Sequence, residues 1–195
     1  MAASKNTNTT AGALRIIGGQ WRSRKLKFTP GEGLRPTSDR VRETLFNWLA
    51  PVIENARCAD LFAGSGALGL EALSRGAAHC DFVDTSATAL TDISQHLKLL
   101  DAQILGSCHR QTAQSFVQQK NTPIDILFID PPFGKGLVDP VCEAISLAKS
   151  LAPQAWIYVE TPRSQPPPAC PENWQLYRDK TAGDVAYRLF QVHKP

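Results

Sequence analysis

The most restrictive feature of the sequence is a nearly all-apolar run, residues 124–129, that ends in Asp130-Pro131-Pro132-Phe133. A short run of this kind, without polar alternation, is typical of a strand buried on both faces of a parallel sheet. Helices must then cover both faces, which favours an α/β fold. An aspartate at the carboxyl end of such a strand lies where open α/β sheets bind their ligands. The run therefore predicts both a fold class and the place of a site.

The residues after this run suit an aromatic amine. The two prolines stiffen the turn, because each fixes its own φ and Pro132 also restricts Pro131. Three groups are then expected to converge: the Asp130 carboxylate, the Pro131 carbonyl and the flat ring of Phe133. Two acceptors beside a stacking surface match a planar heterocycle with an exocyclic NH2. The alternative is a turn that only ends a strand.

Strand and helix patterns alternate around this run. Strands are expected at 59–62, 79–83, 103–108, 124–129 and 156–160, and helices at 67–75, at about 90–100, at 112–119 and near 138–148. Two alternating segments, 174–178 and 185–192, predict a closing antiparallel hairpin. The sum is a doubly wound, mostly parallel, seven-stranded Rossmann-like sheet in a single catalytic domain, residues 52–195.

A glycine-rich loop is expected after the first strand of this sheet. Residues 64–69 fit the pattern GxGxxG, and Asp84 follows Gly64 by 20 residues. That spacing is also found in dinucleotide sites. However, Asp60 just before the loop would repel a pyrophosphate, and no second domain is present for a nicotinamide substrate. S-adenosylmethionine fits better, with its ribose hydroxyls on Asp84 and its methionine amine near Asp60.

The segment before this domain, residues 13–51, is basic. Between Arg15 and Trp48, eight basic side chains outnumber three acidic ones, which suggests a polyanion contact. A β-hairpin is expected over 14–28, turning at Gly18-Gly19, and then a helix capped by Thr37 or Ser38. The predicted RNA-binding side chains are Arg15, Trp21, Arg22, Arg24, Lys25, Arg35, Arg40 and Arg42. Residues 1–12 show no periodicity and are expected to be a disordered tail.

Composition narrows the setting. No apolar run approaches the roughly 20 residues that cross a bilayer, and the N-terminus lacks a signal-peptide core, so a cytoplasmic location is expected. The five cysteines are dispersed without a CxxC pair, and the four histidines show no ligand spacing. The sequence therefore predicts reduced thiols and neither a disulfide framework nor a metal site. Nothing indicates an obligate protein partner or a membrane.

Two motifs together resemble a known class. Residues 60–75, DLFAGSGALGLEALSR, and 130–133, DPPF, look like class I S-adenosylmethionine-dependent amino-methyltransferases. More narrowly, residues 15–22, 33–49 and 185–188 resemble the bacterial 16S ribosomal RNA guanine-N2 methyltransferases, the RsmD family. The resemblance covers nearly everything after residue 12. It implies methylation of one guanine of 16S ribosomal RNA on its exocyclic N2, in the small subunit or a partly assembled particle.

The resemblance also implies which residues form the site. Catalytic roles fall on Asp130, Pro131 and Phe133, and cofactor contacts on Asp60, Phe62, Gly64, Ser65, Gly66, Asp84, Thr112, Ala113 and Asp130. One position departs from the family pattern, because Thr112 stands where an Asp or Asn commonly precedes the alanine. Thr112 can form hydrogen bonds but carries no charge, and the backbone N–H of Ala113 could still bind adenine.

The sequence motifs also permit other functions. The amine-binding motif alone permits an adenine or cytosine amino-methyltransferase acting on DNA or RNA, although the chain is short for a separate target-recognition domain. A nicotinamide-dependent oxidoreductase and a non-catalytic RNA-binding assembly factor are weaker alternatives. The first lacks a substrate domain, and the second would not need an intact Asp130-Pro131-Pro132-Phe133.

Overall fold

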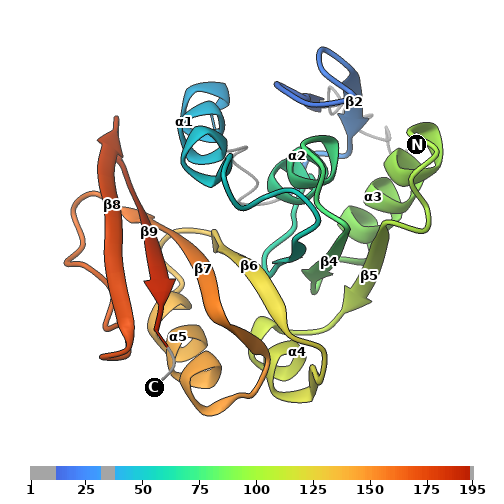
Figure 1. Ribbon diagram of the computed structural model, residues 1–195. Helices are drawn as coiled ribbons and strands as arrows, with labels where there is room; N and C mark the ends of the chain where they lie inside the picture. Colours follow the sequence, from blue (N-terminus) through green and yellow to red (C-terminus); the bar gives the residue numbers. More distant parts are fainter. Residues whose placement is uncertain (1–11, 32–37, 194–195) are drawn as a thin grey trace, which may run out of the picture.

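A computed structural model describes residues 12–31 and 38–193 and contains one open seven-stranded sheet (Figure 1). Its strands are β3 (Arg57–Asp60), β4 (His79–Asp84), β5 (Gly106–Arg110), β6 (Ile124–Ile129), β7 (Leu151–Pro162), β8 (Trp174–Ala182) and β9 (Val185–Val192). They lie in the order β5-β4-β3-β6-β7-β9-β8. The first five are parallel, while β9 is antiparallel to both β7 and β8. The predicted doubly wound sheet with a closing hairpin is confirmed.

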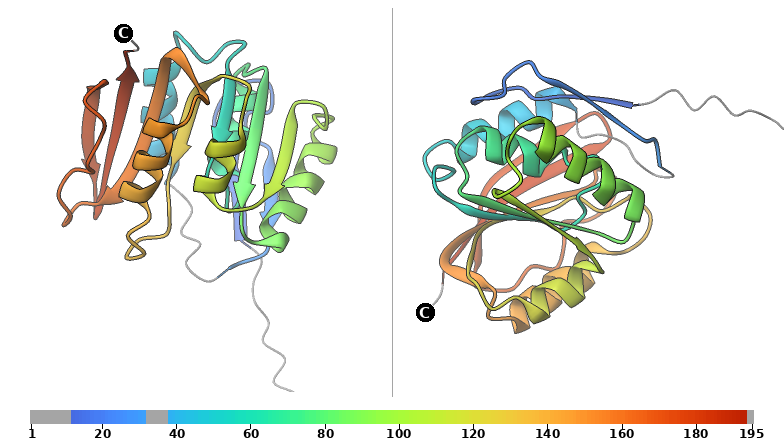
Figure 2. Two further views of the ribbon diagram at one scale, coloured as in Figure 1. Left: turned by 90° about the horizontal axis from the view of Figure 1, so that it is seen from below. Right: turned by 90° about the vertical axis from the view of Figure 1, so that its right-hand side faces the viewer.

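Helices cover both faces of this sheet (Figure 2). One face carries α1 (Asp39–Leu49), α2 (Ala67–Ser74) and α3 (Ala87–Leu99), and the other carries α4 (Ala113–Gln119) and α5 (Val138–Leu147). Outside α2 and α3 lies a small hairpin made of β1 (Gly12–Arg15) and β2 (Lys25–Phe28). The basic segment and the sheet therefore pack together in one body.

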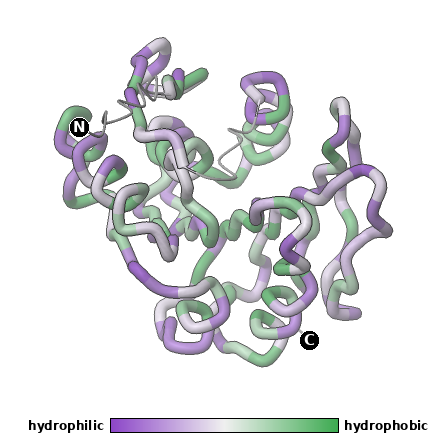
Figure 3. Tube along the Cα trace, turned by 180° about the vertical axis from the view of Figure 1, so that it is seen from behind, coloured by the Kyte–Doolittle hydropathy of each residue, from purple (hydrophilic) through white to green (hydrophobic). Residues whose placement is uncertain are grey.

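Alternation along the strands gives each face its own hydrophobic core. On β6, Phe128 belongs to the cluster under α1 and α2, whereas Leu127 and Ile129 belong to the cluster under α4 and α5. Successive side chains of a strand point to opposite faces, which accounts for this division. The central strands are accordingly mostly apolar, while the outer helix turns and loops are more polar (Figure 3). Leu45 and Phe46 of α1 are fully buried in the first cluster.

Two predicted strands are displaced along the chain. The first core strand is Arg57–Asp60 and not 59–62, because the chain leaves the regular ladder after Asp60 to form the glycine loop. The edge strand is Gly106–Arg110 and not 103–108. Before it, Asp101 adopts a left-handed conformation (φ 53°), and the Leu105 N–H donates to the Ala102 carbonyl at 2.9 Å. This turn removes residues 103–105 from the strand.

The N-terminal hairpin forms, but it does not reverse at Gly18-Gly19. The tight turn lies at 20–23, and Gly18-Gly19 runs against α2. A Cβ on Gly19, whose φ is +75°, would stand 1.7 Å from the carbonyl oxygen of Ser74. The glycine is thus required for close backbone approach to α2, which a sequence pattern cannot distinguish from a hairpin turn.

The structure describes only part of two further predicted features near the N-terminus, the helix cap and the tail. Ser38 caps α1, its hydroxyl accepting from the Val41 N–H at 3.3 Å, while Thr37 lies outside the described residues. Of the predicted tail, Gly12 already belongs to β1, and residues 1–11 lie outside the described part. Within 12–31 and 38–193, no helix is long and apolar enough to span a bilayer.

Candidate active site

Three carboxylates come together where the strand order changes direction. β3 has β4 on one side and β6 on the other, so the chain crosses over the sheet in both directions from this strand. Asp60 ends β3, Asp84 ends β4 and Asp130 follows β6 directly. Open α/β sheets form their ligand crevices at such switch points. The structure thus brings together the three acidic residues that the sequence predicts for the site.

The glycine loop between β3 and α2 is shaped by one of these carboxylates. Asp84 Oδ2 accepts from the Gly64 N–H at 2.9 Å, and Asp84 Oδ1 accepts from the Ser86 N–H at 2.8 Å. Gly66, just before α2, has φ +81°, a left-handed conformation that favours glycine. Ionised carboxylate oxygens each have a second lone pair, so Asp84 can still accept from ribose hydroxyls.

Asp60 is the most deeply buried member of the set, with 1% of its surface exposed. Its Oδ2 accepts from the Gly69 N–H at 3.1 Å. Among the described residues, no donor reaches Oδ1 at ordinary hydrogen-bond distance, although the Phe62 N–H lies near the carboxylate. Burial, and then the charges of Asp130 and Asp84, raise the pKa of Asp60 from 3.8 to about 7. A buried acceptor short of donors is costly and suits a cationic ligand.

The remaining predicted cofactor residues surround this loop or begin α4. Ser65 is buried and Phe62 half-buried. Thr112 caps α4, its hydroxyl accepting from the Ser115 N–H at 3.2 Å. Ala113 is the first residue of that helix, where a backbone N–H has no intrahelical acceptor. The cluster of acceptors around a close-approach loop fits S-adenosylmethionine, which carries an ammonium and a sulfonium, and does not fit a pyrophosphate.

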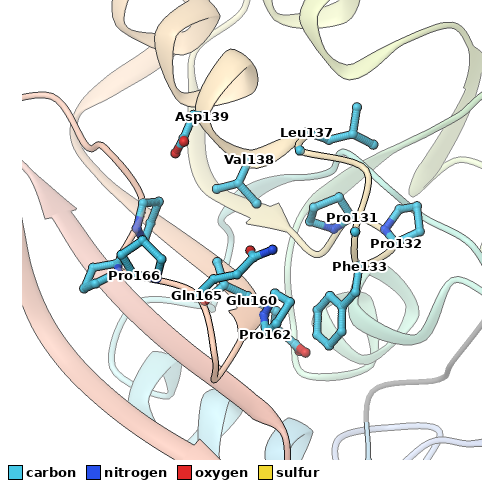
Figure 4. A pocket seen from close by; sticks show the side chains of 15 residues that line it. Pro131, Pro132, Phe133, Leu137, Val138, Asp139, Glu160, Pro162, Gln165 and Pro166 are labelled. Atoms are coloured by element: carbon cyan, nitrogen blue, oxygen red, sulfur yellow. The ribbon is translucent and has the colours of Figure 1, made fainter.

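A pocket opens beside Asp130, between the end of β6 and the chain that follows β7 (Figure 4). It has a volume of about 340 Å³, within the usual range of small-molecule sites. Pro131, Pro132 and Phe133 lie on one side of it, and Gln165 and Pro166 on the other. Phe133 is 38% exposed, so its ring is accessible for stacking. The pocket is placed to receive a flat ring.

A tyrosine–glutamate pair adjoins this pocket. Tyr158, on β7, donates its hydroxyl to Glu160 Oε1 at 2.6 Å, and both side chains are buried. Burial, followed by the charges of Glu160 and Asp130, raises the pKa of Tyr158 well above its ordinary value. The phenol therefore stays protonated as a donor, and the two carboxylates lie near the same hydroxyl.

Apart from Arg42, the residues predicted to bind RNA divide into three groups. Arg22, Lys25 and Arg40 are exposed. Others have protein contacts: Arg15 pairs with Asp39 at 2.8 Å, the Arg24 guanidinium donates to the Leu99 carbonyl at 3.1 Å, and Trp21 is partly packed on the core. Arg35 lies outside the described residues.

The assignment of Arg42 to the RNA surface is wrong. Its side chain is 2% exposed, pairs with Asp39 at 2.6 Å and donates to the Arg15 carbonyl at 2.9 Å. Glu71 lies 3.7 Å from its guanidinium. Position 42 shares the buried face of α1 with Leu45 and Leu49, so this arginine holds the N-terminal segment inside the protein.

Glu71 and Ser74 on α2 fasten the loop 16–24. The fully buried Glu71 carboxylate accepts from the Ile17 and Gly18 N–H groups, each at 2.8 Å. Ser74 donates its hydroxyl to the Gly18 carbonyl at 2.6 Å and accepts from the Trp21 N–H at 3.0 Å. We call this set of contacts the α2 clamp. It fixes the basic loop to the helix that starts at the glycine loop.

Sequence reasoning missed two residues, although each leaves a signal. Glu71 is a charged residue in an otherwise apolar helix, which indicates a buried partner. Glu160 follows an apolar run, residues 156–159, just as Asp130 follows the run 124–129. Both signals are carboxylates in apolar surroundings, a pattern that marks either structural clamps or sites.

The strand order, the glycine loop after β3 and the acid at the end of β4 define the class I methyltransferase fold. An RNA methyltransferase from Salinibacter ruber, solved in complex with S-adenosyl-L-homocysteine, shares this fold at 12% identity (TM-score 0.63, 83% of this chain and 95% of that one). The family model described as Conserved hypothetical protein 95 matches residues 14–191. The chain therefore belongs to this family, which is the RsmD family indicated by the sequence.

Individual relatives are similar over nearly their whole length. Ribosomal RNA small subunit methyltransferase D of Escherichia coli is 49% identical over 190 residues, 96% of this chain and 94% of the relative. The protein of the same name from Haemophilus influenzae is 43% identical over 192 residues, 95% and 97% of the two chains. The solved structure of yhhF from Escherichia coli superposes with a TM-score of 0.86 at 49% identity, over 94% of this chain and all of that one.

Proposed function

We propose that this chain transfers a methyl group from S-adenosylmethionine to the exocyclic N2 of one guanine in 16S ribosomal RNA. The names of its close relatives support ribosomal RNA of the small subunit as substrate. Within the molecule, one observation supports the proposal: three carboxylates lie around a glycine loop, and a pocket suited to a flat ring begins at Pro131, directly after one of them.

The cofactor side of the site depends on the arrangement of acceptors. S-adenosylmethionine, when bound, supplies an electrophilic methyl group on a positively charged sulfur. Asp84 would accept from the ribose hydroxyls while it holds Gly64, and Asp60 would face the methionine ammonium. Ala113 and Thr112 would contact the adenine. Three carboxylates in one place favour a ligand that carries an ammonium and a sulfonium, and disfavour the pyrophosphate of NAD.

The base side acts on a poor nucleophile, because the N2 lone pair of guanine is delocalised into the ring. Hydrogen bonds from the NH2 to Asp130 and to the Pro131 carbonyl would make this nitrogen more pyramidal and aim its lone pair at the methyl group. Positive charge develops on N2 as the bond forms, so the two acceptors stabilise the transition state more than the ground state. Phe133 would stack on the base, which must be unpaired or flipped.

The exposed cations of the N-terminal segment would hold the RNA backbone. Arg22 and Lys25 are exposed, and phosphate contacts of this kind position a nucleic acid without reading its bases. We place the reaction on the small subunit or a partly assembled particle, in the cytoplasm, without an obligate protein partner of the enzyme itself.

Methyl transfer from labelled cofactor tests this proposal. Small-subunit particles, free 16S ribosomal RNA and duplex DNA are each incubated with the protein and with S-adenosylmethionine labelled in its methyl group. Label should appear in one guanine of the RNA and be recovered as N2-methylguanine. Label recovered in adenine or cytosine, or transfer to DNA alone, would contradict the proposal and support the other amino-methyltransferases that share the motif.

Replacement of Asp130 by alanine should lower the rate of methyl transfer by about 10³, because an acceptor for the amine and its proton is lost. The dissociation constant for S-adenosylmethionine, measured by calorimetry, should change little. Asp184→Ala, in the exposed turn between β8 and β9, serves as the control and should keep full activity. An Asp130→Ala protein of normal rate would remove this residue from the mechanism.

A further inference from the structure

Glu160 is a buried carboxylate for which the mechanism above has no role. It lies near the end of β7, is 3% exposed and accepts from the Tyr158 hydroxyl at 2.6 Å. Ile129 of β6 is in register with Val159 of β7, so the next residues along these parallel strands, Asp130 and Glu160, are neighbours. A second acid therefore stands beside the proposed amine acceptor.

The two acids also face the same side of the sheet. Phe128 and Tyr158 belong to one core cluster, and their ring centroids are 6.4 Å apart. Residues two positions along a strand share its face, so Asp130 and Glu160 are on this same side. Glu160 lines the pocket together with Pro131 and Phe133 (Figure 4). A base stacked on Phe133 would present its edge toward both carboxylates.

Guanine is the common base whose edge matches two neighbouring acceptors. Its N1–H donor stands next to its N2 amine, so the edge presents a continuous row of donors. Adenine and cytosine carry an amine next to a bare ring nitrogen, which is an acceptor and would be repelled by a carboxylate. A carboxylate has about four acceptor positions, so the bond from Tyr158 leaves capacity for a base.

We propose that Glu160 is the specificity-determining residue of this site and accepts a hydrogen bond from guanine N1–H, while Asp130 and the Pro131 carbonyl hold N2. Tyr158 acts as a positioning residue that orients Glu160. This assignment rests on the proposed function. It explains how a motif suited to any aromatic amine would become selective for guanine.

The test compares two substrates that carry the same reacting amine. In one small-subunit RNA the modified guanine is retained; in the other it is replaced by 2-aminopurine, which keeps the 2-amino group and has an acceptor at N1. The wild-type protein should prefer guanine in kcat/KM by on the order of 10², since a buried acceptor is otherwise left facing an acceptor. Glu160→Gln, whose amide can donate to N1, should reduce this preference at least tenfold.

Two controls separate this role from a structural one. Glu143→Gln makes the same chemical change on the exposed side of α5 and should leave the preference unchanged. Tyr158→Phe should reduce the preference by less than Glu160→Gln does, and cofactor affinity should be preserved in every variant. Because the readout is a ratio within one protein sample, partial loss of folded protein does not alter it.

The outcomes distinguish the two levels of the proposal. Equal rates on guanine and 2-aminopurine in the wild type, or a Glu160→Gln protein that slows both substrates equally, would overturn the role of Glu160 while leaving the methyltransferase function standing. A wild type that places no methyl group on guanine N2 would overturn the proposed function, and the role of Glu160 with it.

Discussion

Asp60 combines a structural bond with a charge state that is sensitive to pH. It is buried, its Oδ2 accepts from the Gly69 N–H, and burial raises its pKa to about 7, with further contributions from Asp130 and Asp84. In the unliganded protein it is therefore partly protonated at neutral pH. A bound ammonium group favours the ionised form, so cofactor binding is expected to release a proton from this residue.

The affinity for S-adenosylmethionine should therefore increase about tenfold from pH 6 to pH 8, since Asp60 changes from mostly protonated to mostly ionised across a pKa of about 7. Calorimetry in two buffers with different ionisation enthalpies measures both the affinity and the released proton. Asp60→Asn should bind more weakly at pH 8 and lose the part of the pH dependence that belongs to this side chain. An unchanged pH profile in the variant would refute this.

Asp60 has the opposite effect on the stability of the unliganded protein, which decreases with pH while the affinity for the cofactor increases. Its folded pKa of about 7 lies above the ordinary value of 3.8, so the folded state binds more protons than the unfolded state between these values. The contribution of Asp60 to stability is complete below about 4 and is lost as the pH rises through 7. The ligand and the empty fold thus favour different protonation states of one side chain.

The location of a site residue was predictable from sequence where its position in a strand or helix determines its surroundings. Asp60 and Asp84 end β3 and β4 and Asp130 follows β6, and parallel strands end at one edge of the sheet. Arg42 was mispredicted because a positive charge in a basic segment does not tell whether it is buried. Its spacing from Leu45 and Leu49 would have placed it on the apolar face of α1.

At the scale of elements, α2 has two roles. Its start carries the glycine loop, and its later turns carry the α2 clamp. All residues of this helix are buried, and Glu71 is surrounded by two backbone N–H groups and two arginines, Arg42 and Arg75. Removing the charge of one partner from such a cluster leaves the others unpaired.

Glu71→Gln should lower the free energy of unfolding by about 3 kcal/mol, because the amide has one oxygen where two N–H donors and two guanidinium groups need acceptors. Urea denaturation measures the change, and the amides of Ile17 and Gly18 should exchange with deuterium faster. Glu43→Gln, exposed on α1, is the matched control and should stay within about 0.5 kcal/mol of the wild type. Equal stability of both variants would show that the clamp carries little energy.

The periodicity of the sequence predicted which segments are helices and which are strands, but it did not predict all of their ends. The buried strand 124–129 was predicted with its observed ends because a polar residue and prolines bound an apolar run. The edge strand β5 was misplaced because its residues are only partly buried and its start depends on the turn at Asp101. Gly18-Gly19 was misassigned because its partner, Ser74, is far away in sequence.

On the scale of the whole molecule, a basic outer layer covers one face of the sheet. The hairpin β1–β2 and the loop 16–24 lie outside α2 and α3, while α4 and α5 cover the opposite face (Figure 2). Arg22 and Lys25 project from this layer. Arg24 donates to the end of α3, so its replacement would remove a contact between the hairpin and this helix as well as a charge.

The double variant Arg22→Gln/Lys25→Gln should weaken binding to 16S ribosomal RNA, with the slope of log K against log salt shallower by about 1.4, or about 0.7 for each lost contact with single-stranded phosphate. Fluorescence anisotropy over a range of salt concentrations provides the slope. Cofactor affinity should be unaffected.

Lys149→Gln/Arg178→Gln removes two exposed charges that lie after α5 and on β8, and serves as the control with an unchanged slope. If both double variants gave the same slope as the wild type, the N-terminal layer would not be the phosphate contact.

α2 is an eight-residue helix, about 12 Å long, with the loop that would surround the methyl donor at one end and the anchored cationic loop near the other. If that loop binds a strand of RNA, the length of α2 sets the distance between the bound phosphate and the methyl donor. Such an enzyme would select its nucleotide partly by the distance between a bound phosphate and the methyl donor. A guanine displaced along the RNA would then be methylated only as far as α2 can bend.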